Sequence, residues 1–190
     1  MSSRVTVVIG AATPPGRLHA AATVAADRLR AGGADVSVVD LSSVRIEVAD
    51  GRSDGAYDEP TCAAVAAVEQ ADAVIVVSPV YRASIPGVLK NLLDLVPVTA
   101  LEAKPVGIVA MGGSAHHYLG VDRHLRDILS WFGALVAPTS VYFTAGDFND
   151  GIPTEEAVVA LGELATTVLT LSDRLSGTAL GPEPLAKRAW

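Results

Sequence analysis

Several kinds of residue and segment are scarce in this chain of 190 residues, and each scarcity excludes a class of protein. A single cysteine, Cys62, rules out an internal disulfide framework and is typical of a reducing compartment. No uncharged apolar stretch reaches the roughly 18 residues that a membrane span needs. The N-terminus leads into an alternating apolar segment and shows no signal-peptide cleavage pattern. We therefore expect a cytoplasmic protein in which Cys62 is a small core residue.

Basic residues are also scarce, with 14 lysines and arginines against 21 aspartates and glutamates. The resulting net charge of -7 leaves no basic patch large enough to hold nucleic acid. Hydrophobic residues make up 50% of the chain and charged residues 18%, which suits a globular protein with a substantial core. We expect one domain over residues 1–175, followed by a loosely held tail over 176–190.

What the chain does have is a regular alternation of short apolar runs and stretches with helical periodicity. We expect strands over Arg4–Ile9, Asp35–Asp40, Ala73–Val77, Pro105–Met111 and Leu135–Phe143. We expect helices over Arg17–Ala31, Thr61–Ala71, Gly87–Leu95, His117–Phe132 and Thr154–Leu175, with a surface loop over Arg45–Glu59. This alternation predicts an α/β three-layer sandwich with a parallel sheet, and five strands in one domain favour the flavodoxin-like order 2-1-3-4-5.

In that strand order, three loops converge on the crevice where open α/β sheets bind ligands. They are residues 10–17, 78–87 and 112–116. The first loop opens a helix, whose free amides and dipole attract phosphate, and Arg17 adds a positive charge. This loop is neither a G-x-G-x-x-G motif nor a P-loop. The second is stiff, bounded by prolines and carries Tyr81, so it can cradle a flat polar ring. In the third, Gly112 and Gly113 let the backbone approach a ligand.

Two of these loops also have a plainer interpretation. The first and third are compatible with ordinary glycine turns, and His116 either touches a ligand or serves as a capping or solvated residue. A metal site is not expected, because His117 and His124 have no carboxylate or thiol at ligand spacing. No G-x-S-x-G elbow or convincing pair of carboxylates is present either, so the pattern favours a cofactor cradle with the chemistry left to the cofactor.

The middle loop and the helix after it, residues 78–94, are followed by Met111-Gly112-Gly113-Ser114-Ala115-His116 and a helix containing Val121-Asp122. This sequence resembles the NADPH-dependent FMN reductase family, and is most similar to the flavin reductases of two-component alkanesulfonate monooxygenase systems. The similarity extends from the first strand through the fifth. It implies that FMN binds at the three loops, that hydride passes to it from NADPH or NADH, and that reduced FMN goes to a partner monooxygenase.

The resemblance also implies which residues form the site. The ring would lie against the middle loop and the third loop, and no side chain would act as a catalytic acid or base; the backbone at Tyr81 and Arg82 would lie near the ring. The expected flavin-binding residues are Gly10, Thr13, Gly16, Arg17, Pro79, Val80, Tyr81, Arg82, Gly112, Gly113, Ser114 and His116.

The first loop departs from the family pattern, in which Gly-Ser-Pro is followed by Ser-Arg-Ser/Thr at the helix start. This chain has Gly10-Ala11-Ala12 and then Gly16-Arg17-Leu18, so three hydroxyls that would hold the phosphate are missing. Because hydrogen bonds to a charged group contribute about 1.5–3 kcal/mol each, we expect FMN to bind exchangeably.

Two other functions compete with this one: a tightly flavinated quinone, azo or chromate reductase on the same fold, and a non-enzymatic flavodoxin-like electron carrier. We also expect a homodimer or homotetramer, because the third and fourth helices carry more apolar residues than one side of a sheet can absorb, and because family members pair through these elements.

Overall fold

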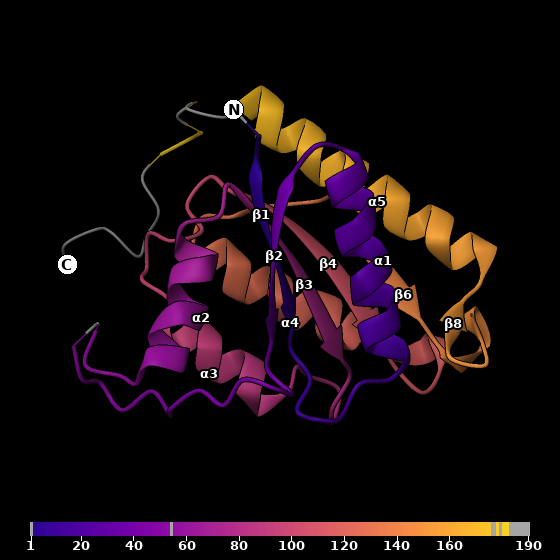
Figure 1. Ribbon diagram of the computed structural model, residues 1–190, viewed down its shortest axis with the longest axis horizontal. Coiled ribbons are helices and arrows are strands. Elements are labelled where there is room, and N and C mark those ends of the chain that lie inside the picture. Colours follow the sequence, from indigo (N-terminus) through magenta and orange to yellow (C-terminus); the bar gives the residue numbers. More distant parts are fainter. Residues whose placement is uncertain (1, 54, 176–177, 179, 183–190) are drawn as a thin grey trace.

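The predicted order of the parallel sheet, 2-1-3-4-5, is confirmed in the computed structural model, which describes residues 2–53, 55–175, 178 and 180–182 (Figure 1). Apolar, mostly β-branched runs form the central strands, which are buried on both faces. The strands are β1 (Arg4–Ile9), β2 (Asp35–Asp40), β3 (Ala73–Pro79), β4 (Pro105–Met111), β5 (Leu135–Val136) and β6 (Val141–Phe143).

The predicted fifth strand, Leu135–Phe143, is wrong as a single element. Its two ends, β5 and β6, pair separately with β4 in parallel. Between them the amide of Ala137 still donates to the carbonyl of Val106 (2.8 Å), and Pro138 follows, which has no amide proton to continue the ladder. The proline therefore interrupts the edge of the sheet.

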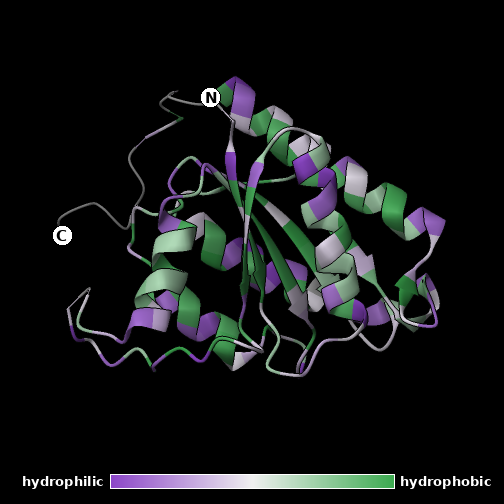
Figure 2. Cartoon of the chain, in the orientation of Figure 1, coloured by the Kyte–Doolittle hydropathy of each residue, from purple (hydrophilic) through white to green (hydrophobic). Residues whose placement is uncertain are grey.

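Helices cover both faces of the sheet, as the alternation predicts (Figure 1). Helices α1 and α5 pack on one face, and α2, α3 and α4 share a core with the other. Figure 2 shows the strands as mainly hydrophobic, with hydrophilic residues on the outer sides of the helices. The helices are α1 (Arg17–Ala31), α2 (Glu59–Glu69), α3 (Gly87–Leu95), α4 (Tyr118–Trp131) and α5 (Glu155–Leu175).

Helix α2 begins two residues before the predicted Thr61. The Asp58 carboxylate caps it by accepting from the amide of Thr61 (3.0 Å), and a proline occupies the first turn, where its missing N–H is harmless. The prediction missed this signal. The half-buried Cys62 lies in this first turn, and its thiol donates to the carbonyl of Tyr57 (3.4 Å), so it is not the core residue expected.

Several short elements were not predicted. A 3₁₀ turn η1 (Ala115–His117) precedes α4, and η2 (Ala145–Asp147) leads into a hairpin of β7 (Phe148–Asn149) and β8 (Ile152–Pro153). The hairpin turn is Asp150-Gly151, and both residues have positive φ (48° and 87°). Because Asp-Gly is a preferred pair for two-residue hairpins, this signal was present in the sequence.

The apolar side chains of α3 and α4 are for the most part absorbed by the chain's own core, contrary to expectation. Leu89, Leu92, Leu125 and Leu129 are each at most 1% exposed. Trp131 remains half-exposed beside a groove between the two helices.

No helix in the described part of the chain has both the length and the apolar character needed to cross a membrane. The tail expected over residues 176–190 falls mostly outside the described residues.

Candidate functional site

The three predicted loops leave the sheet side by side, because β1, β3 and β4 end at the same edge. The amide of Gly10 donates to the carbonyl of Val77 (2.8 Å), and that of Val80 donates to the carbonyl of Met111 (2.8 Å). The register pairs Pro79 with Met111, so Pro79 is the last residue of β3 rather than part of the loop. The hydrogen bonds between neighbouring strands thus bring the starts of all three loops to one edge of the sheet.

The middle loop contains a tight turn, Tyr81–Ser84, that is closed by two backbone hydrogen bonds. Tyr81 and Ser84 each donate to the other's carbonyl, at 2.8 and 2.9 Å. The central residues Arg82 and Ala83 have φ of 50° and 60°, a region that residues other than glycine rarely adopt. Such backbone strain, on the order of 1–3 kcal/mol per residue, concentrates at ligand sites. The two central amides take no part in closing the turn, and both residues are exposed.

Helix α4 holds this turn in place. Nδ1 of His124 lies 2.8 Å from Oγ of Ser84, within hydrogen-bond distance. Gly120 lies against the turn, since a Cβ there would approach the carbonyl oxygen of Ala83 to 3.0 Å. His124, considered above as a metal ligand, is therefore a brace for the loop, and the described residues contain no group of three potential metal ligands.

The strained turn leads to a testable expectation. Replacing Ala83 with glycine should raise the free energy of unfolding by about 0.5–1 kcal/mol, because glycine adopts positive φ without strain but gains more freedom in the unfolded chain. The same change should weaken the FMN binding proposed below severalfold, because a looser turn presents its amides less well. Chemical denaturation and a flavin titration measure the two effects.

Ala103 provides the matched control, since it also has positive φ (56°) and lies before β4, at the opposite end of that strand from the crevice. Ala103→Gly should stabilise the protein similarly and leave FMN affinity unchanged. Equal FMN affinity in both variants would contradict the role of the turn.

The third loop depends on Tyr142, which the sequence did not single out. Its hydroxyl donates to the carbonyl of Ser114 (2.7 Å), and burial raises the pKa of Tyr142. Gly112 leaves room for this ring, because a Cβ there would collide with the tyrosine hydroxyl. A Cβ on the exposed Gly113, in contrast, would meet no protein atom. Gly113 therefore faces open space, while Gly112 is needed for packing. The third predicted residue of this loop region, His116, is exposed in η1.

The first loop divides into a buried start and an exposed end. A Cβ on Gly10 would lie 2.7 Å from Cδ2 of Leu89, so its need for glycine is a packing need. Thr13, Gly16 and Arg17 are exposed, and α1 begins after Gly16 with no side chain capping its first amides. Leu18, which stands where the family pattern has a hydroxyl, is buried in the core and contributes to packing instead. The first turn keeps free amides and one positive charge for an anion.

His19, which the sequence analysis missed, connects the start of α1 to the end of β2. The Gly16 amide donates to its Nδ1 (3.3 Å), which places the ring proton on Nε2. Nε2 lies 3.3 Å from Oδ1 of Asp40 and 3.2 Å from Oγ of Ser42. Burial alone would raise the pKa of Asp40, but hydrogen bonds from Ser42 and the neighbouring His19 outweigh it and lower that pKa. The ionised Asp40 thus orients His19.

A cavity of about 600 Å³ is lined by Ala12 of the first loop, by the start of α3 and by the segment after β2, and by no residue of the third loop. Another, of about 510 Å³, lies between β6 and α5 and contains no residue of the three loops. Exposed loop backbone, free amides and the open space over Gly113 fit a flat, anionic ligand such as FMN.

The fold, with three loops leaving the carboxyl edge of its parallel sheet, is that of a flavodoxin-like α/β protein. The chain belongs to the NADPH-dependent FMN reductase family, whose model matches residues 3–148 and so includes all three loops.

Two relatives and one solved structure illustrate the similarity. The chain is 40% identical over 116 residues, 61% of its length, to the NAD(P)H-dependent FAD/FMN reductase of Geobacillus thermodenitrificans (strain NG80-2). It is 48% identical over 99 residues, 52% of its length, to the NADH-dependent FMN reductase SfnF of Pseudomonas fluorescens (strain Pf0-1). These matches span 63% and 53% of the two relatives. An oxidoreductase from Corynebacterium diphtheriae superimposes with a TM-score of 0.71 at 25% identity, covering 92% of this chain and 99% of the other.

Proposed function

We propose that this protein is an NAD(P)H-dependent FMN reductase, in which FMN accepts a hydride from the reduced nicotinamide. The observation that carries the proposal is the strained turn Tyr81–Ser84, which lies at the edge of the sheet from which the other two loops also leave. A family model that spans all three loops supports it, as do relatives whose names specify FMN reduction.

The residues of the crevice would bind and orient both substrates. Amides of Arg82 and Ala83 would donate to the polar edge of the flavin and stabilise negative charge that develops there. Holding the two rings in contact supplies much of the rate enhancement of a bimolecular transfer. The exposed Tyr81 and the open backbone at Gly113 would line the ring, so no side-chain acid or base is required.

The first turn of α1 would hold the FMN phosphate through amides and Arg17 alone. Because Gly16 has no hydroxyl and Leu18 is buried, the phosphate receives fewer charged hydrogen bonds than a hydroxyl-rich loop would give. We infer that FMN exchanges freely and behaves as a substrate. A reduced flavin released in this way would suit a separate cytoplasmic monooxygenase as its acceptor.

We further propose that two copies of the chain associate through α3 and α4. The groove between these helices has a volume of about 480 Å³ and is lined largely by apolar side chains, with Val98 and Trp131 exposed. Association would cover these side chains.

The test is a steady-state assay of the purified protein with NADPH or NADH, with and without added FMN. We expect nearly colourless protein that oxidises at least one nucleotide only when FMN is added. No FMN-dependent oxidation by folded protein would overturn the proposal. Bright yellow protein that reduces quinones without added FMN would favour the tightly flavinated reductase instead.

A further inference from the structure

The cavity beside the first loop has the volume of a ligand site. Its volume of about 600 Å³ falls within the roughly 300–1,000 Å³ typical of small-molecule sites. One wall is Ala12 of the first loop, another is the start of α3, and the third is the segment that follows β2. The side chains from that third wall are Leu41, Ser42, Val44, Arg45, Ile46 and Val48.

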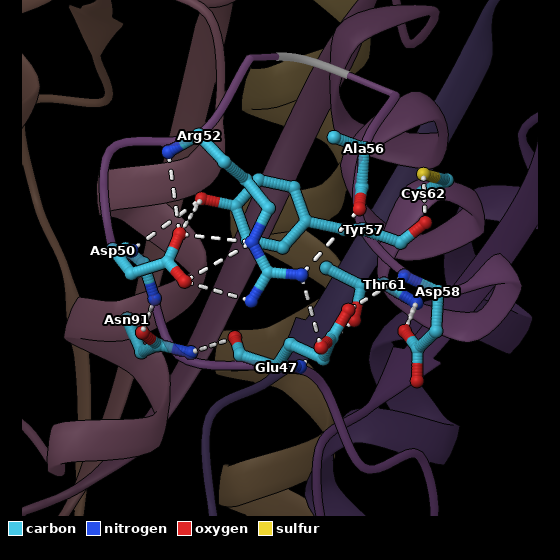
Figure 3. Close-up of polar contacts among 10 residues, drawn as sticks. Glu47, Asp50, Arg52, Ala56, Tyr57, Asp58, Thr61, Cys62 and Asn91 are labelled. Carbon is cyan, nitrogen blue, oxygen red and sulfur yellow. Dashed lines mark hydrogen bonds and ion pairs between the residues drawn. The ribbon is translucent and has the colours of Figure 1, made fainter.

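The third wall is held rigidly, although the sequence predicted a plain surface loop there. Asn91 of α3 binds it on both sides, donating to the carbonyl of Glu47 (2.8 Å) and accepting from the amide of Ala49 (2.9 Å; Figure 3). The amide of Glu47 donates to Oγ1 of Thr61 (2.8 Å), and its carboxylate accepts from the amide of Asp58 (2.7 Å). The cavity is therefore preformed.

Two arginines of this segment differ sharply in their surroundings. Arg52 is fully engaged: it binds Asp50 through two nitrogens, reaches Glu47 (3.2 Å) and lies over the ring of Tyr57, and it lowers the pKa of Asp50 to about 2 (Figure 3). Arg45 lines the cavity, is exposed, and pairs with no carboxylate of the described residues. No acidic residue lines the cavity. The cavity lining therefore carries one positive charge, that of Arg45, and no negative charge, as an anion-binding site requires.

The remaining lining is suited to a flat apolar group. Val44, Ile46 and Val88 are half-buried, and Val48 is 73% exposed, which is unusual for a large apolar side chain on a rigid wall. An arginine beside an apolar surface matches a nucleoside phosphate, whose base lies on the aliphatic side chains while its phosphate accepts from the guanidinium.

The cavity also adjoins the place proposed for the FMN phosphate. Ser42, on the cavity wall, lies 3.2 Å from Nε2 of His19, and His19 accepts from the amide of Gly16 at the start of α1. A ligand could therefore extend from the crevice into the cavity past Ala12. The proposed reaction has one substrate that continues beyond a first phosphate into an adenosine phosphate, NAD(P)H. A flavin of this kind, FAD, is named in the activity of the relative from Geobacillus thermodenitrificans.

We propose that this cavity is an adenosine-phosphate subsite in which Arg45 binds the phosphate and the aliphatic wall binds the adenine. The proposal rests on the proposed flavin reductase function for the source of the group. It assigns recognition of the adenosine end of a dinucleotide substrate to Arg45.

The direct test is binding of 5′-AMP and of adenosine 2′,5′-bisphosphate to flavin-free protein, measured by calorimetry. The parent should bind at least one of them, and Arg45→Ala should weaken binding about tenfold, with Arg45→Lys between the two. Arg174→Ala, which removes an exposed arginine from the last turn of α5, is the matched control and should bind as the parent does. Absence of binding to the parent, or equal binding by Arg45→Ala, would overturn the proposal.

Steady-state kinetics then distinguish the two sources of the adenosine phosphate, NAD(P)H and FAD. If the group comes from NAD(P)H, Arg45→Ala should raise the KM for the nucleotide about tenfold with either flavin. If it comes from FAD, the variant should raise the KM for FAD and leave that for FMN unchanged. Unaltered KM values for nucleotide and FAD would count against the subsite. AMP binding without FMN-dependent oxidation would support the subsite while overturning the proposed reductase function.

Discussion

Replacing Gly113 with valine should lower FMN affinity about tenfold to a hundredfold while leaving the fold intact. A Cβ at Gly113 would meet no protein atom, and the residue is not in the positive-φ region, so the folded chain tolerates a side chain there. Two methyl groups would instead occupy the space proposed for the ring, and overpacking of a close contact costs about 1–3 kcal/mol. Quenching of flavin fluorescence measures the affinity, and Gly113→Ala should give a smaller loss.

Gly146 is a suitable control for this substitution. It is exposed in η2, outside the three loops, and a Cβ there would make only an ordinary contact at 3.7 Å with Oγ1 of Thr144. Gly146→Val should bind FMN as the parent does. If Gly113→Val retained full affinity and parental melting behaviour, the ring would have to lie elsewhere.

Gly10→Val should destabilise the protein strongly, by about 2–3 kcal/mol, through packing rather than through ligand contact. Its Cβ would lie 2.7 Å from Cδ2 and 2.9 Å from Cβ of Leu89, and both residues are buried, so the first loop and α3 would have to separate. For a chain of this size, that change lowers the melting temperature by about 4–12 °C. Thermal unfolding without flavin measures the effect.

A double variant tests the assigned cause. Leu89→Ala alone should also destabilise, because it leaves a cavity, but combining it with Gly10→Val should cost less than the sum of the two changes. Strict additivity would show that Gly10 and Leu89 do not compete for the same space. Gly16→Val, where a Cβ would meet nothing, should leave stability within about 1 kcal/mol of the parent.

The sequence by itself determined the layered architecture and the edge of the sheet at which the three loops lie. Arg4–Ile9, Arg17–Ala31 and Pro105–Met111 have the predicted boundaries, because apolar periodicity and glycine or proline at the ends act over a few neighbouring residues. The alternation of strands and helices then predicts a parallel sheet, and the order of its strands brings the three loops to one edge of that sheet.

Only the tertiary structure decided how those loops are held and what lies beside them. The turn at Arg82 and Ala83 contains no glycine or asparagine, so nothing local announces its positive φ; it is imposed by packing against α4. The links His19 to Asp40 and Asn91 to Glu47 join residues 21 and 44 positions apart, which no local pattern specifies. Side-chain hydrogen bonds of this kind depend on where folding brings distant segments together. Such bonds hold the wall of the cavity that Arg45 lines, so the hydrophobic periodicity of the sequence could not predict that cavity.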